Sequence, residues 1–136
     1  MTSVRWALLA VLLMVLPFIR DIVQPMIPFE ETDWVQARVY TWLTLGAAAV
    51  GSVVVTLAAR WDRWRSAFWL GVVGVVLCLV RALGYCWMIT TETNIGAGFM
   101  FLASGALLAL CAMVLLVLTV RRWRVLRRVS AAGPGR

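Results

Sequence analysis

The chain contains 136 residues, of which 63% are hydrophobic and 14% charged, and its mean hydropathy is +0.92. Because soluble domains typically contain about 45–50% apolar and about 25% charged residues, this composition argues against a water-soluble globule, and the length allows one domain at most. The 13 basic residues are all arginine, there are 6 acidic residues and no histidine, and the net charge is +7. The chain therefore lacks the commonest general base at neutral pH and the commonest metal and haem ligand. We expect no enzymatic activity, no cofactor and no metal site.

Four segments are long and apolar enough to cross a membrane, for which about 20 residues are needed. They are rich in Leu, Ala and Val without the alternation of a membrane barrel, and backbone amides in lipid must bond internally, so we predict α-helices. The predicted spans are approximately 4–23, 38–59, 66–89 and 98–120. The sequence thus predicts an all-α integral membrane four-helix bundle, built from two transmembrane hairpins over residues 1–128. A disordered cytoplasmic tail is predicted at 129–136.

The arginines are distributed unevenly over the segments that connect these spans. Because Lys and Arg stay on the cytoplasmic side of membrane proteins, the side that holds ten of the thirteen arginines is predicted to be cytoplasmic, with both termini inside. Those ten are Arg5, Arg60, Arg63, Arg65, Arg121, Arg122, Arg124, Arg127, Arg128 and Arg136. Arginine as the sole basic residue, with abundant Ala, Gly and Val, is typical of a GC-rich bacterial genome and favours a location in the plasma membrane.

Arg81 is the one charge clearly inside a predicted span. It lies 16 residues after Arg65, about 24 Å along a helix, which places it in the outer third of the membrane. Arg20 and Asp21 reach a similar depth in the first span, so we predict an ion pair between Asp21 and Arg81 with Arg20 extending outward. Tyr85 shares a helical face with Arg81 and completes the candidate polar site. Such charges are either structural partners or parts of a transport path, and the sequence leaves both interpretations open.

Glycines recur inside the predicted spans. Small residues allow two helices to approach closely in a membrane, and they mark packing faces more often than pores. The candidate packing residues are Gly46, Gly51, Gly71, Gly74, Gly98 and Gly105.

The segment 121–128 follows the last span and alternates arginines with apolar residues. This pattern is typical of juxtamembrane segments that contact anionic lipid, at about 1 kcal/mol per charge near the surface. Binding of nucleic acid is not indicated, because no recognition motif accompanies the charge. The candidate docking residues, for anionic headgroups or an acidic partner, are Arg121, Arg122, Arg124, Arg127 and Arg128.

These observations favour a non-catalytic accessory or assembly subunit of a larger membrane complex, or a homo-oligomer. Its partners would be the lipid bilayer, including anionic headgroups, and another membrane protein or a second copy of itself. One alternative is a small transporter or channel that uses Arg81 and Asp21 in an ion or substrate path. A holin-like pore former is a third class.

Overall fold

Four α-helices make up the part of the chain that the structure, a computed structural model, describes, namely residues 2–24, 34–90 and 95–131. They are α1 (Thr2–Val23), α2 (Trp34–Trp61), α3 (Arg65–Thr90) and α4 (Ile95–Ala131). Each contains a stretch that is long and apolar enough to cross a membrane, which confirms the four predicted helices.

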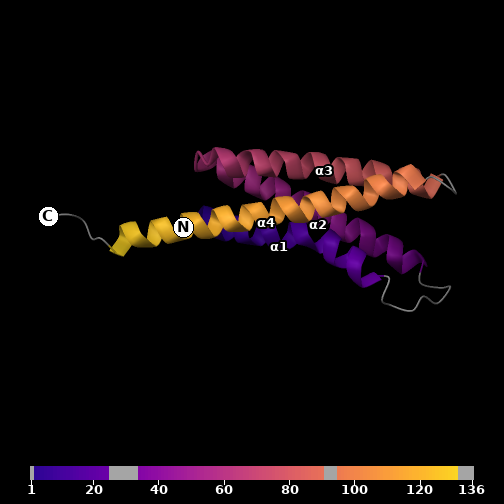
Figure 1. Cartoon of the computed structure of the whole chain (residues 1–136), viewed down its shortest axis with the longest axis horizontal. Helices are drawn as coiled ribbons and strands as arrows, with labels where there is room; N and C mark the ends of the chain where they lie inside the picture. Colours follow the sequence, from indigo (N-terminus) through magenta and orange to yellow (C-terminus); the bar gives the residue numbers. More distant parts are fainter. Residues whose placement is uncertain (1, 25–33, 91–94, 132–136) are drawn as a thin grey trace.

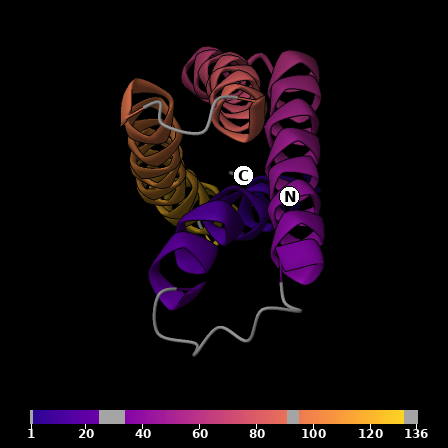
Figure 2. The ribbon, with the colours of Figure 1, turned by 90° about the vertical axis from the view of Figure 1, so that its right-hand side faces the viewer.

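The helices form a closed ring in which each packs against two others. α1 contacts α2, α2 contacts α3, α3 contacts α4, and α4 returns to α1. Figure 1 shows consecutive helices running side by side in alternating directions, and Figure 2 shows the ring from one end. α1 and α3 therefore lie on one diagonal of the bundle and α2 and α4 on the other.

A tight turn joins α2 to α3. The amide of Trp64 donates to the carbonyl of Ala59 at 2.9 Å, the amide of Arg63 donates to that of Arg60 at 3.4 Å, and Arg63 has a φ of 49°. A residue in the left-handed region followed by this pair of bonds is a common way to end a helix. The turn holds α2 and α3 antiparallel and brings Asp62 to the end of the bundle at which α1 begins.

Small side chains on the inward faces let the helices approach one another closely. Ala10, Ala48 and Ala112 are fully buried. Hydroxyl groups in this interior donate to their own helix, Ser52 to the carbonyl of Ala48 at 2.8 Å and Thr56 to that of Ser52 at 2.7 Å, so they remain satisfied without water. The buried face of α3 consists of Ala67, Gly71, Gly74, Cys78, Arg81, Gly84 and Tyr85.

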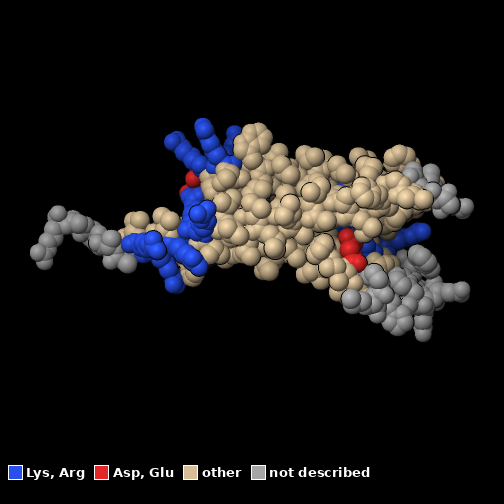
Figure 3. All heavy atoms as spheres, viewed as in Figure 1, with Lys and Arg blue, Asp and Glu red and all other residues tan. Residues whose placement is uncertain are grey.

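The outer surface of the bundle is apolar along its middle and charged at its ends. Figure 3 shows arginines gathered at one end and a broad belt without charge beside them. Large apolar side chains are exposed on all four helices, as expected of a surface that faces lipid rather than water. Exposed tryptophans lie towards both ends of this belt: Trp6, Trp61, Trp69 and Trp123 towards the arginine-rich end, Trp42 and Trp87 towards the other.

The last helix is longer than its predicted span. α4 continues past residue 120 as far as Ala131, so residues 129–131, predicted as part of the tail, are helical. The sequence offers no helix breaker in this stretch, where Arg, Val and Leu predominate, until Gly133 and Pro134. Residues 132–136 lie outside the described residues.

The six predicted packing glycines divide into two groups. At Gly51, Gly71, Gly74 and Gly105 a Cβ atom would collide with a neighbouring helix or with a side chain in the interior. Gly46 and Gly98 have no atom within 4 Å of that position. At these two positions an added Cβ would therefore meet no other helix among the described residues. At Gly46 the reason is that Leu45 and Ala48 occupy the inward face of α2.

The two glycines of α2 provide a matched test of this packing. A Cβ at Gly51 would lie 2.9 Å from Cβ of Leu13 and 3.1 Å from the carbonyl oxygen of Ala10, and backbone cannot move away cheaply. We expect Gly51→Ala to lower the free energy of unfolding by about 1–3 kcal/mol. Gly46→Ala should be neutral or stabilising, because alanine is the better helix former by about 1 kcal/mol. Unfolding in detergent micelles, followed by far-UV circular dichroism, measures both, and equal effects would contradict the packing.

Candidate functional site

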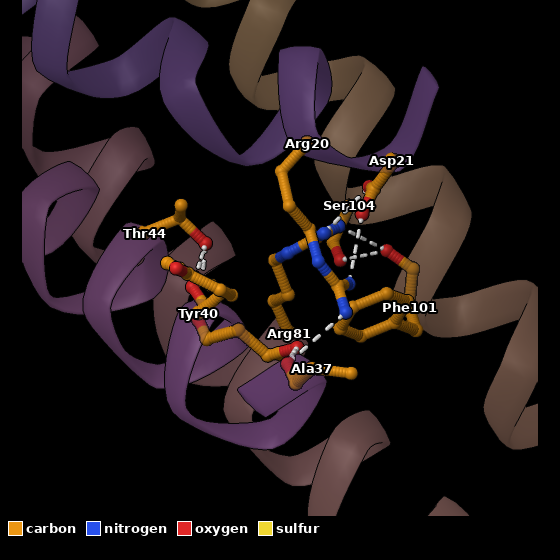
Figure 4. A network of polar contacts seen from close by, with 9 residues as sticks. Arg20, Asp21, Ala37, Tyr40, Thr44, Arg81, Phe101 and Ser104 are labelled. Atoms are coloured by element: carbon orange, nitrogen blue, oxygen red, sulfur yellow. Dashed lines mark hydrogen bonds and ion pairs between the residues drawn. The ribbon is translucent and has the colours of Figure 1, made fainter. Parts of the chain in front are cut away.

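Arg81 crosses the centre of the bundle and pairs with Asp21 on the opposite helix. Its side chain is 1% exposed, and Nη2 lies 2.5 Å from Oδ2 of Asp21, which is itself 10% exposed. Nη1 donates to the carbonyl oxygen of Phe101 on α4 at 2.6 Å (Figure 4). Because α1 and α3 are diagonal in the ring, this side chain spans the interior between two helices that are not packing neighbours.

Residues of α4 surround the guanidinium group of Arg81. The ring of Phe101 lies 3.8 Å from Cζ of Arg81, a cation–π contact that covers one face of the guanidinium group. One turn further along, Gly105 has no side chain, and a Cβ there would collide with Nη1 of Arg81 and lie 3.0 Å from Oδ2 of Asp21. The hydroxyl of Ser104 donates to the carbonyl of Phe101 at 2.9 Å, so this oxygen accepts a bond from each of two side chains, Arg81 and Ser104. The guanidinium group thus faces Phe101 and Gly105 of α4, and Ser104 bonds to the same carbonyl oxygen.

Arg20 is the third charge of the cluster and adds α2 to it. Its Nη1 lies 3.3 Å from Oδ1 of Asp21, and its Nη2 donates to the carbonyl of Ala37 at 3.4 Å (Figure 4). The two oxygens of Asp21 thus face different guanidinium groups, with Arg81 held closely and Arg20 more distantly. The cluster connects all four helices near one end of the bundle.

Tyr85 lies beside the ion pair as part of an aromatic wall. Its ring is 5.6 Å from that of Phe101 and meets the ring of Trp42 edge to face at 5.5 Å. The structure therefore places all four predicted polar-site residues close together, with Tyr85 in contact with the ring that covers Arg81 rather than bonded to a charge.

The arrangement of the cluster is suited to holding charges in place. In the described residues every buried side-chain nitrogen or oxygen has a hydrogen-bond partner, so the interior leaves no polar atom unsatisfied. In the same part of the chain no three His, Cys, Asp or Glu side chains come together as a metal site would require. A buried ion pair of this kind is costly to break, because removing one partner leaves the other charge in an apolar interior.

A second charged cluster, which the sequence did not indicate, lies at the arginine-rich end. The hydroxyl of Ser3 donates to Oδ2 of Asp62 at 2.6 Å, and Nη2 of Arg122 lies 2.7 Å from the same oxygen. Cζ of Arg122 also lies 4.6 Å from the ring of Trp64. Asp62 thereby joins the start of α1 and the end of α4 to the α2–α3 turn. The side chains of Asp62 and Arg122 are 45% and 26% exposed, so this pair lies in a solvated setting.

The predicted docking arginines extend beyond this cluster along α4. Arg122 is half-buried, and the other four are exposed: Arg121, Arg124, Arg127 and Arg128. Cζ of Arg127 lies 4.1 Å from the ring of Trp123 one turn earlier. The structure therefore leaves these charges at the surface rather than paired inside the bundle.

Comparison with known proteins adds no relative. No protein family matches the chain, and neither the curated proteins nor the solved structures contain a match.

The two aspartates offer a matched comparison of buried and exposed pairing. Asp21→Asn should lower the free energy of unfolding by about 3–5 kcal/mol, because Arg81 stays buried without its carboxylate. Asp62→Asn should cost less than about 1 kcal/mol, because water screens that pair. The double variant Asp21→Asn with Arg81→Met, which removes both charges, should recover much of the loss. Unfolding in detergent measures all three, and similar losses for both single variants would contradict the interpretation.

Proposed function

We propose that this chain is a small multi-pass protein of a bacterial plasma membrane, without catalytic activity, that serves as an accessory or assembly subunit. The observation that carries the proposal is the closed state of the interior: both hydrogen-bonding ends of Arg81 are taken by Asp21 and Phe101. Because the polar groups in the interior bond to one another, they are suited to holding the four helices in one arrangement. What remains for partners is the outside of the bundle.

The outside offers two kinds of surface to a partner. Along the middle, apolar side chains on all four helices suit lipid, another membrane protein or a second copy of the chain. At the arginine-rich end, the exposed arginines of α4 suit anionic headgroups or an acidic surface of a partner protein. A nucleic acid is not proposed as a partner, because no recognition motif accompanies these arginines.

The length of α4 adds weight to a docking role for its end. Its 37 residues span about 55 Å, whereas the hydrocarbon core of a bilayer is about 30 Å thick. In Figure 1 the end of α4 extends past the other three helices. With this end in the cytoplasm, its last two to three turns would project to headgroup level and beyond, where a partner's soluble face could reach them.

A small transporter or channel is the second candidate function. The observation that favours it is the position of Asp21 and Arg20, whose side chains are 10% and 16% exposed and thus reach the surface of the cluster. An ion or substrate path would have to break the contacts of Arg81 during each cycle.

The proposed orientation has a direct test. Because ten of thirteen arginines belong to the predicted inner side, both termini should lie in the cytoplasm. Fluorescent-protein fusions at either end should fluoresce, and alkaline phosphatase fused at either end should be inactive in intact cells. Phosphatase inserted in the α1–α2 connection, within residues 25–33, provides the opposite control. An active phosphatase at either terminus would contradict the orientation.

Replacement of Arg81 distinguishes the two functions. If the chain is a subunit, Arg81→Ala should lower its level in the membrane or its recovery with a native partner in mild detergent, and purified protein in liposomes should carry no flux. If it is a transporter, the purified native chain should carry flux in liposomes, and an equal amount of the folded variant should carry none. Arg38→Ala, an exposed arginine of α2, is the matched control and should change neither. Lysis or depolarisation of cells on induced expression of the native chain would instead indicate a pore former.

A further inference from the structure

The polar cluster near the start of α2 contains more positive than negative charge. Among the described residues it consists of Arg20, Arg81 and the single carboxylate of Asp21. The formal charge of these three groups is +1, and the aromatic rings of Phe101 and Tyr85 lie beside them. An uncompensated charge in such surroundings is unfavourable, and a nearby anion lowers its free energy.

The excess charge belongs mainly to Arg20. Arg81 is held at 2.5 Å by Asp21 and at 2.6 Å by the carbonyl of Phe101, both short charge-assisted bonds. The contacts of Arg20 are 3.3 Å to Asp21 and 3.4 Å to the neutral carbonyl of Ala37, which are long for a guanidinium group. Asp21 therefore neutralises Arg81 first and Arg20 only in part.

Arg20 is also the cation of this cluster that the surroundings can reach. Its side chain is 16% exposed, against 1% for Arg81. It lies in the last turn of α1, at the end of the bundle opposite the arginine-rich end. A helix end that follows an apolar span lies at the depth of lipid headgroups, where phosphate groups are concentrated.

We infer that Arg20 binds one phosphate group at this end of the bundle, with Asp21 and Arg81 as the rigid support behind it. The planar guanidinium fork matches phosphate oxygens, and its remaining N–H donors can engage them while Nη2 stays near Ala37. The carboxylate of Asp21 limits the site to one such group, because a second anion would meet its negative charge. The phosphate can belong to a phospholipid headgroup or be free in solution. This inference does not depend on the subunit role proposed above.

The test follows the Nε–H resonance of Arg20 by NMR. The protein, labelled with ¹⁵N-arginine, is studied in a maltoside detergent free of phosphate. Comparison with Arg20→Gln assigns the resonance, and Arg20→Lys serves if the glutamine variant does not fold. Inorganic phosphate and short-chain phosphatidylglycerol are titrated separately. Arg38, an exposed arginine near the start of α2 at the same end, is the matched control and is assigned through Arg38→Gln.

We expect a saturable shift of the Arg20 resonance that is several times larger than that of Arg38 in at least one titration. Saturation by phosphatidylglycerol alone identifies a headgroup as the source, and saturation by inorganic phosphate identifies a free anion. Equal, non-saturating shifts of Arg20 and Arg38 would overturn the inference. The same titrations are repeated on a triple variant of the α1–α2 connection, Glu30→Gln with Glu31→Gln and Asp33→Asn. A shift of the Arg20 resonance in this variant but not in the native chain would also overturn the inference, because carboxylates of the connection would then neutralise Arg20 in the native chain.

Discussion

A guanidinium group in the interior of an apolar bundle has to be neutralised, and the contacts of Arg81 constrain how the four helices are arranged. Asp21 must reach it from the diagonal helix, which fixes α1 and α3 relative to one another along the bundle axis. Gly105 and the carbonyl of Phe101 must face it from α4, which fixes the rotation of that helix. Apolar contacts alone would tolerate small rotations and shifts of each helix, whereas a shift that separated Arg81 from Asp21 would leave a buried charge unpaired, which is costly.

One carboxylate at each end of the described bundle joins elements that are distant in sequence. Asp21 links α1 to α3, and Asp62 links the α2–α3 turn to the first turn of α1 and to α4. The two differ in their surroundings, since Asp21 is nearly buried and Asp62 is about half exposed. The first therefore contributes strongly to the choice of one arrangement, and the second acts as a weaker, solvent-screened fastening at the arginine-rich end.

The sequence predicted most of the fold and the central part of the site. Apolar segments of membrane-spanning length revealed the helices, and equal depth along two spans was enough to pair Asp21 with Arg81. The bond from Arg81 to Phe101 could not be predicted from the sequence, because every residue has a backbone carbonyl and the residue type does not reveal which one accepts. The contacts of Ser3 and Arg122 with Asp62 depend on how the ring closes, and Gly46 shows that a glycine does not reveal which way it faces. The orientation in the membrane and the subunit role remain predictions.

The sharing of Asp21 between two arginines bears on the order in which the molecule is made. The first hairpin contains both Arg20 and Asp21, which are adjacent in the sequence, so these two side chains can pair before the rest of the chain exists. The second hairpin brings Arg81 without any acidic residue of its own within α3 or α4. Arg81 therefore obtains its carboxylate from the first hairpin, and the same carboxylate also lies 3.3 Å from Arg20. The buried ion pair can therefore form only once both halves of the chain have been synthesised.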